Sequence, residues 1–138
     1  MSIKENKAVI RRWFNMINKH DLSMINEVVS DAFVANEFGM EFKGPEALKR
    51  AFTVGFAGFP DLHYRIDDMV AQGDKVAVRY TRTGTNKGEY RGFAPKNKWT
   101  TVTGAFFYRL AGGKITEAMG YSDRLDLLQQ MGVSPPGQ

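Results

Sequence analysis

The chain has 138 residues, of which 43% are hydrophobic and 25% charged, and its 19 Lys and Arg against 15 Asp and Glu give a net charge of +4. This length and balance indicate one globular domain with a single core and exclude a disordered or fibrous protein. Because the chain contains no cysteine, disulfides, thiolate metal sites and cysteine nucleophiles are excluded as well.

The positive charge does not predict nucleic-acid binding. Acidic residues are interspersed among the basic ones, so the sequence forms no basic stripe of the kind that binds phosphates. The densest basic stretch, residues 87–98, also holds Glu89 and four turn-forming residues, which favours a solvated hairpin. No apolar run is long enough for a signal peptide or a membrane span, so we expect a cytoplasmic protein without a membrane partner.

Three helices are expected before residue 60. The first, over residues 3–19, has an apolar face at helical spacing, formed by Ile10, Trp13, Phe14 and Ile17. Asp21 is expected to cap a short second helix that ends at residues 30–31. The third begins at Gly44-Pro45 and ends at Pro60, and its inner stripe consists of Leu48, Ala51, Phe52, Gly55, Phe56 and Phe59.

Strands make up most of the remaining chain. A strand over residues 32–36 and an irregular or edge segment over 37–43 precede the third helix. After Pro60, apolar residues alternate with polar ones, which predicts a hairpin that turns at residues 72–74. A second hairpin is expected to join residues 99–110 to residues 114–122. Finally, Ser122 or Asp123 is expected to cap a last helix that stops at Gly132.

This order of elements predicts an α+β fold in which the helices cover one face of the sheet. We expect one domain over residues 1–132 and a frayed tail over residues 133–138, where prolines follow the last helix.

Five short strings, in chain order, carry a family resemblance. They are residues 44–48 (Gly-Pro-Glu-Ala-Leu), 59–62 (Phe-Pro-Asp-Leu), 73–79 (Gly-Asp-Lys-Val-Ala-Val-Arg), 113–115 (Gly-Lys-Ile) and 127–132 (Leu-Leu-Gln-Gln-Met-Gly). Together they resemble the SnoaL-like polyketide cyclases, also called ester cyclases, of the nuclear transport factor 2-like superfamily. The resemblance implies a cone-shaped, curved mixed or antiparallel sheet wrapped by three N-terminal helices. It also implies an apolar pocket, a homodimer, and chemistry on small hydrophobic, polyketide-like molecules without a cofactor.

The catalytic residues that this family implies are missing from the chain. The family's aspartate, which removes a proton from carbon, corresponds to Gly120. Its histidine and glutamine correspond to Phe106 and Gly104, and a histidine of related members corresponds to Ala118. The aldol cyclase mechanism therefore cannot be transferred unchanged. A nearby acid could replace the aspartate only if the pocket buries it and raises its pKa.

A few polar residues near the strand ends are weak candidates for catalysis. Asn36 ends the first strand, where its amide could donate to a substrate oxygen or occupy a turn. Glu37 and Glu41 are the nearest alternative bases, although most such acids are solvated. Asp123 lies near the last strand, where a helix cap is the better interpretation.

The substrate-binding residues expected from parity, aromatic character and resemblance form one set. They are Trp13, Phe14, Asn36, Phe56, Phe59, Arg79, Gly104, Phe106, Ala118 and Gly120. Arg79 either anchors an anion in the pocket or lies in solvent, and the resemblance favours the pocket. His20 and His63 have no partner at metal-ligand spacing, so no metal site is expected.

Three functions remain open. The first is a cofactor-free cyclase or isomerase, and a cofactor-free hydroxylase is a variant of it. The second is a protein that binds an apolar ligand without chemistry. An epoxide hydrolase of this fold would need an Asp-Arg-Asp set, which the strand positions do not offer.

Overall fold

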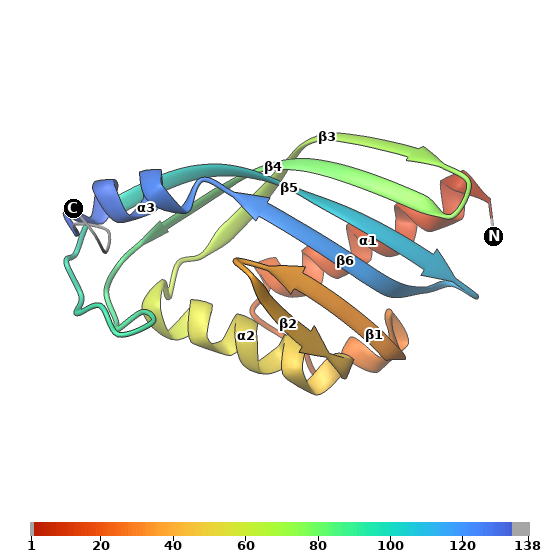
Figure 1. Ribbon diagram of the computed structural model, residues 1–138, viewed down its shortest axis with the longest axis horizontal. Helices are drawn as coiled ribbons and strands as arrows, with labels where there is room; N and C mark the ends of the chain where they lie inside the picture. The colour runs from red at the N-terminus through yellow and green to blue at the C-terminus, as the bar shows by residue number, and fades with distance from the viewer. Residues whose placement is uncertain (1, 134–138) are drawn as a thin grey trace.

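A strongly curved sheet organises the computed structural model, which describes residues 2–133 (Figure 1). Its six strands lie in the order β2-β1-β6-β5-β4-β3. All neighbouring strands are antiparallel except β1 and β6, which are parallel. In chain order the strands are β1 (Val29–Glu37), β2 (Met40–Lys43), β3 (His63–Gln72), β4 (Lys75–Thr85), β5 (Trp99–Ala111) and β6 (Lys114–Ser122).

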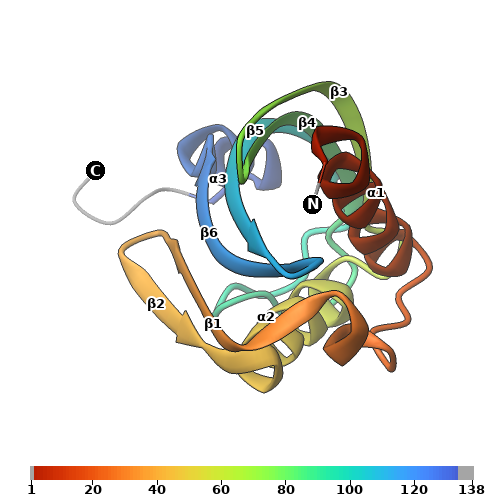
Figure 2. The same ribbon diagram turned by 90° about the vertical axis from the view of Figure 1, so that its right-hand side faces the viewer.

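Two helices cover the concave face of this sheet, as Figure 2 shows. They are α1 (Ile3–Asn18) and α2 (Gly44–Gly58), and the predicted apolar face of α1 is buried. A capping box between Ser2 and Glu5 begins α1, and a proline in the first turn begins α2. The predicted α+β architecture with a curved, mixed sheet is confirmed.

The expectation of three N-terminal helices is wrong. The described chain has two there and a third at its C-terminal end, α3 (Arg124–Met131), with only a 3₁₀ turn at Ile25–Glu27 between α1 and β1. The Asp21 carboxylate caps no helix, because it accepts hydrogen bonds from the Ser23 amide and hydroxyl within a tight turn. Val29 instead begins β1 and pairs with Ile115 of β6. Long-range strand pairing thus overrides a local helical pattern.

The C-terminal helix has the ends that the sequence predicts. The Asp123 carboxylate accepts a hydrogen bond of 3.0 Å from the Asp126 amide. Gly132 ends α3 with a φ of 80°, and the Val133 amide bonds back to the Leu128 carbonyl at 2.8 Å. Val133 therefore packs against the core, and the rest of the expected tail, residues 134–138, lies outside the described residues.

Close strand contacts leave no room for a side chain at Gly104 of β5. A Cβ there would meet the Tyr80 hydroxyl of β4 and lie 2.6 Å from the Tyr121 carbonyl oxygen of β6. Gly55 in α2 contrasts with this position, since the nearest atom to its added Cβ is in the Leu62 side chain, at 3.6 Å.

We therefore expect opposite effects from the same substitution at these two glycines. Gly104→Ala should lower the free energy of unfolding by about 1–3 kcal/mol through overpacking. Gly55→Ala should raise it by up to about 1 kcal/mol through helix propensity. Urea unfolding followed by circular dichroism measures both. Equal stability of Gly104→Ala and the wild type would contradict the close contact.

Candidate functional site

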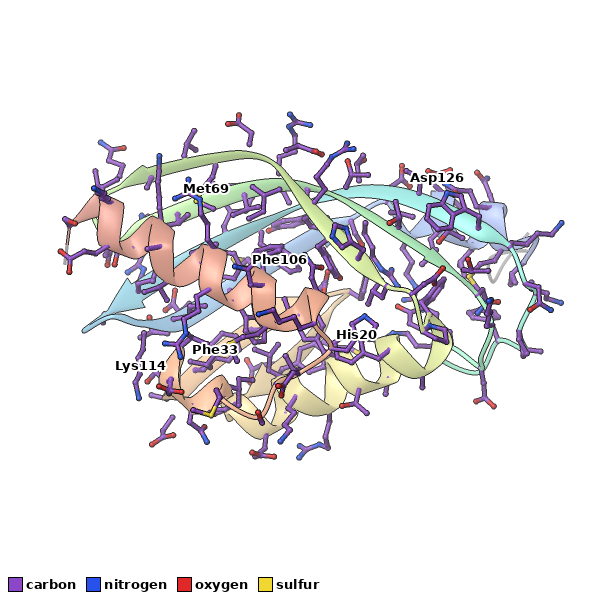
Figure 3. All side chains as sticks on the ribbon, turned by 180° about the vertical axis from the view of Figure 1, so that it is seen from behind. His20, Phe33, Met69, Phe106, Lys114 and Asp126 are labelled. Atoms are coloured by element: carbon purple, nitrogen blue, oxygen red, sulfur yellow. The ribbon has the colours of Figure 1, made fainter. Side chains whose placement is uncertain are left out.

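A cavity lies between the concave face of the sheet and helices α1 and α2, with a volume of about 80 Å³. Typical ligand sites enclose roughly 300–1,000 Å³, so aromatic side chains fill much of this interior. Two of them, Phe33 of β1 and Phe106 of β5, are labelled in Figure 3 and lie in the interior between the sheet and the two helices. A ligand with more than one ring would require some of these side chains to rotate.

Aromatic rings form most of the cavity wall. Trp13 of α1 meets Phe52 of α2 edge to face, with ring centroids 5.5 Å apart. On the sheet side, Phe106 stacks between Tyr80 and Tyr108 at centroid distances of 5.1 and 5.6 Å. These contacts give the cavity an apolar body suited to a flat or cyclic ligand.

Glu37 places a carboxylate in this apolar wall. It is the last residue of β1 and pairs with Gly120 of β6 across the parallel ladder. A Cβ added at Gly120 would lie 2.8 Å from the Glu37 carboxyl carbon and 2.9 Å from its Oε2 atom. The missing side chain at position 120 thus makes the space that the Glu37 carboxylate occupies.

The surroundings of Glu37 favour its protonated form. Burial raises the pKa of this carboxyl above its ordinary value, and the charges of Arg82 and Arg91 lower it by less. None of the ion pairs within 4 Å in residues 2–133 involves Glu37. A raised pKa in a largely apolar wall is typical of carboxyl groups that take and release protons near neutral pH.

Tyrosine hydroxyls supply the hydrogen-bond donors of the cavity. Burial raises the pKa of Tyr64 and of Tyr80, and the nearby Glu37 charge raises both further. Burial also raises the pKa of Tyr108. All three therefore keep their protons at neutral pH and can donate to an oxygen on which negative charge develops.

Two arginines also line the cavity. The guanidinium carbon of Arg82 lies 4.7 Å from the ring centre of Phe59 and 5.8 Å from that of Tyr90. Arg91 lies 5.5 Å from the same Tyr90 ring, and its Nε donates to the Tyr90 hydroxyl at 3.3 Å. Stacking on aromatic rings holds both guanidinium groups in place.

A tightly packed loop positions Tyr90 and Arg91. The Gly58 carbonyl at the end of α2 accepts hydrogen bonds of 3.1 Å from the amides of Lys87 and Gly88. A Cβ at Gly58 would lie 2.9 Å from the Tyr90 Cβ, so only glycine permits this approach. The buried Asn86 side chain bonds within the same loop, to the Gly88 carbonyl and the Lys96 amide.

Six of the residues proposed from the sequence lie on the cavity: Trp13, Asn36, Glu37, Phe106, Ala118 and Gly120. They come from α1, β1, β5 and β6, so the structure brings together residues that are distant in sequence. Asn36 contributes only at the rim, because it is exposed and faces away from its neighbours Ala35 and Glu37.

The other expected residues lie elsewhere, which corrects their placement. Phe14 is buried in the core against the Tyr64 ring, with centroids 5.9 Å apart. Phe56 stacks on His20 at 4.2 Å, and Phe59 packs under Arg82 and Tyr90. Neither ring lines the cavity, because Phe56 packs against the turn after α1 and Phe59, which follows the last residue of α2, packs against the loop that holds Tyr90.

Three polar or small candidates are also displaced from the cavity. Arg79 lies on the outer face of the sheet, where its guanidinium is 3.7 Å from the Asp67 carboxylate and its side chain is 63% exposed. Gly104 lies behind the Tyr80 ring. Asp123 caps α3, as its helix-cap interpretation predicts.

The sequence analysis missed Tyr64, Tyr80, Tyr90, Arg82 and Arg91. The signal for Arg82 was present, since Val76, Val78 and Tyr80 set the inner parity of β4 and Arg82 continues it. Arg91 lies in a loop with a φ of 47°, where no periodicity marks its direction.

Metal and membrane sites receive no support from residues 2–133. That part of the chain has no group of three or more His, Asp or Glu residues able to hold a metal ion. None of the helices described is long and apolar enough to cross a membrane.

Family and structural comparisons agree with this geometry. The family model for SnoaL-like polyketide cyclases matches residues 7–131. The chain belongs to this family. Its fold is nuclear transport factor 2-like, and a proposed SnoaL-like polyketide cyclase from Jannaschia sp. CCS1 superposes with a TM-score of 0.89, at 22% identity over 98% of this chain and 97% of that one.

Two Streptomyces structures are also similar. AclR from Streptomyces galilaeus, a proposed hydroxylase, has a TM-score of 0.87 at 28% identity, covering 97% of this chain and all of AclR. IdmH from Streptomyces antibioticus, a proposed polyketide cyclase, has a TM-score of 0.81 at 25% identity, covering 93% and 99%. No curated protein sequence matches the chain.

The raised pKa of Glu37 makes a prediction about stability. Between its ordinary value of 4.5 and its raised value, the folded protein binds more protons than the unfolded chain, so stability falls as pH rises through this window. Glu37→Gln should therefore be more stable than the wild type at pH 7, and the difference should vanish near pH 4. Thermal unfolding across this range measures it.

Glu41→Gln is the matched control, because Glu41 is an exposed acid on the adjacent strand β2. It should show no such pH-dependent gain. A Glu37→Gln protein that is less stable than the wild type at pH 7 would contradict the cost assigned to the buried carboxylate.

Proposed function

We propose that this SnoaL-like protein binds a small apolar carbonyl compound and that Glu37 removes a proton from the carbon beside the carbonyl, without a cofactor. The observation that carries the proposal is the Glu37 carboxylate, which is largely buried among aromatic rings and lies in the space above Gly120. By resemblance, Gly120 stands where other members of the family have their catalytic aspartate. Glu37 reaches the same space from the neighbouring strand.

The proton transfer follows from the groups in the wall. The Glu37 carboxylate takes the proton, and the electron pair of the C–H bond moves onto the carbonyl oxygen to form an enolate. The Tyr64 and Tyr80 hydroxyls, which stay protonated because burial raises the pKa of each, donate hydrogen bonds to that oxygen. The enolate carbon then attacks a second carbonyl, which is cyclisation, or the proton returns at another carbon, which is isomerisation.

Hydroxylation is the second candidate, and the 28% identity with AclR, a proposed hydroxylase, favours it. The first step would be the same, since the enolate carbon can transfer electrons to molecular oxygen and form a C–O bond. The product is a hydroperoxide, and its conversion to an alcohol and water needs two electrons and two protons from a reductant. The two candidates therefore share Glu37 and differ in what the enolate meets. A protein that binds the ligand without chemistry is the remaining alternative.

Proton exchange at carbon tests the shared step. The probe is 1-indanone, whose protons at C2 exchange slowly with D₂O unless a base is positioned beside them, and NMR follows the exchange. We expect the wild type to accelerate it and Glu37→Gln to reduce the enzymatic rate by roughly 10²–10⁴-fold, the usual contribution of a positioned base.

Glu41→Gln should keep the wild-type exchange rate, because this acid lies outside the cavity. Equal rates for Glu37→Gln and the wild type would refute Glu37 as the base. Binding of 1-indanone without any exchange above the buffer rate would favour the non-catalytic alternative.

We also propose a homodimer through the outer face of the sheet. Large apolar side chains are exposed there on adjacent strands, including Phe107 of β5 at 52% and Met119 of β6 at 47%. These two residues pair across the ladder, and Tyr121 packs against Phe107 with ring centroids 6.1 Å apart. An apolar patch of this kind typically marks a protein contact.

Phe107→Glu should therefore convert the dimer into a monomer at tens of micromolar concentration, since it places charges in the apolar centre of the interface. Light scattering after size-exclusion chromatography measures the mass. Leu125→Glu, an exposed apolar position on α3, is the control and should leave the mass unchanged. A wild-type monomer under these conditions would refute the proposal.

A further inference from the structure

The charged residues of the cavity wall are unbalanced. Arg82 and Arg91 bring two positive charges, whereas Glu37 is the one acidic residue among the lining side chains. Burial raises the pKa of Glu37, so its surroundings disfavour the negative charge that would offset the arginines. The wall therefore presents a net positive charge to its contents.

Neither arginine is neutralised by a carboxylate. Among residues 2–133, the ion pairs within 4 Å include four other arginines, those at positions 12, 65, 79 and 109, but not Arg82 or Arg91. Both residues are only partly exposed. A partly buried guanidinium group with no carboxylate within 4 Å binds carboxylates and similar anions, because donors of its planar fork remain available to pair with both oxygens.

Both guanidinium groups approach the same aromatic ring. Each lies within 6 Å of the same Tyr90 ring, Arg82 at 5.8 Å and Arg91 at 5.5 Å. The hydrogen bonds from Lys87 and Gly88 to Gly58, together with the close contact between Gly58 and Tyr90, hold this ring in place. Stacking on aromatic rings restrains both arginines before a ligand arrives, which limits the entropy lost on binding.

From this geometry we infer that the natural ligand is an acid, with a carboxylate bound by Arg82 and Arg91 and an apolar ring or chain directed toward Trp13 and Phe52. The inference rests on the proposed function in that both use the same cavity, and it adds the substrate class. The ligand is then a carbonyl compound that also carries a free carboxylate, so that Glu37 acts beside its ketone group and the arginines hold its acid group.

Matched acids and esters test the inference. The probes are phenylacetate and 2-naphthoate, each compared with its methyl ester by calorimetry and by tryptophan fluorescence. We expect the wild type to bind each acid at least tenfold more tightly than its ester. Arg82→Met and Arg91→Met should each weaken acid binding by roughly tenfold to a hundredfold and leave ester binding nearly unchanged.

Two further variants separate charge from packing. Arg82→Lys keeps the charge and should retain most of the preference for the acid. Arg79→Met is the matched control, since Arg79 lies on the same strand but on the outer face of the sheet, beside Asp67. It should behave like the wild type. Circular dichroism confirms that each variant is folded before its binding is measured.

Several results would overturn the inference. These are equal affinity for acid and ester, an acid preference that survives both Met variants, or no binding of either acid at millimolar concentration. Tighter binding of phenylphosphonate than of phenylacetate would assign the site to phosphoryl compounds instead. Glu37→Gln separates the two proposals, because it should lose proton exchange and keep the acid preference. Proton exchange without a preference for the acid would support the proposed function and refute the inference of an acidic ligand.

Discussion

The parallel pairing of β1 with β6 is the interaction on which the cavity depends. It joins β1, the first strand in the chain, to β6, the last strand in the chain, which lies inside the sheet. It also sets the register in which Ala35 pairs with Ala118 and Glu37 with Gly120. The chain then turns through β2 into α2, which therefore lies beneath the concave face of the sheet. Without this pairing the lower wall of the cavity, the buried carboxylate and the small residues opposite it would not meet.

The same pairing explains how a carboxylate persists in an apolar wall. An ionised acid withdrawn from water is costly, and the cost is reduced when positive charges lie nearby or the group binds a proton. Both responses are seen at Glu37, whose pKa is raised by burial and partly restored by Arg82 and Arg91. A raised carboxyl pKa of this kind implies a cost in stability at neutral pH, and such costs are common where a side chain serves chemistry rather than folding.

Much of the fold could be predicted from the sequence because its signals are local and strong. The helical stripe of α1, the glycine turns of both hairpins and the Asp123 cap each follow from a few adjacent residues. The short helix expected after Asp21 failed for the opposite reason. Its apolar spacing was real, but Val29 gains more from pairing with Ile115, which lies 86 residues further along the chain, and no local pattern reports that.

The site was less predictable than the fold. Strand parity placed Phe106, Ala118 and Gly120 on the inner face, and extending it along β4 would have selected Arg82 over Arg79. Parity fails in loops, so Arg91 could not be found. The sequence named Glu37 as an alternative base but could not choose it over Glu41, because the choice depends on the strand register that places Glu37 opposite Gly120.

The packing of residues 86–88 against Gly58 limits which positions of the site can change during evolution. The path of the loop is fixed by backbone hydrogen bonds to Gly58, by the Asn86 side chain and by the close contact of Gly58 with Tyr90, and none of these involves the Arg91 side chain. Tyr90 is tied to the core through Phe59, whereas Arg91 is only partly buried, so a descendant protein can replace Arg91, and change what it recognises, without rerouting the chain.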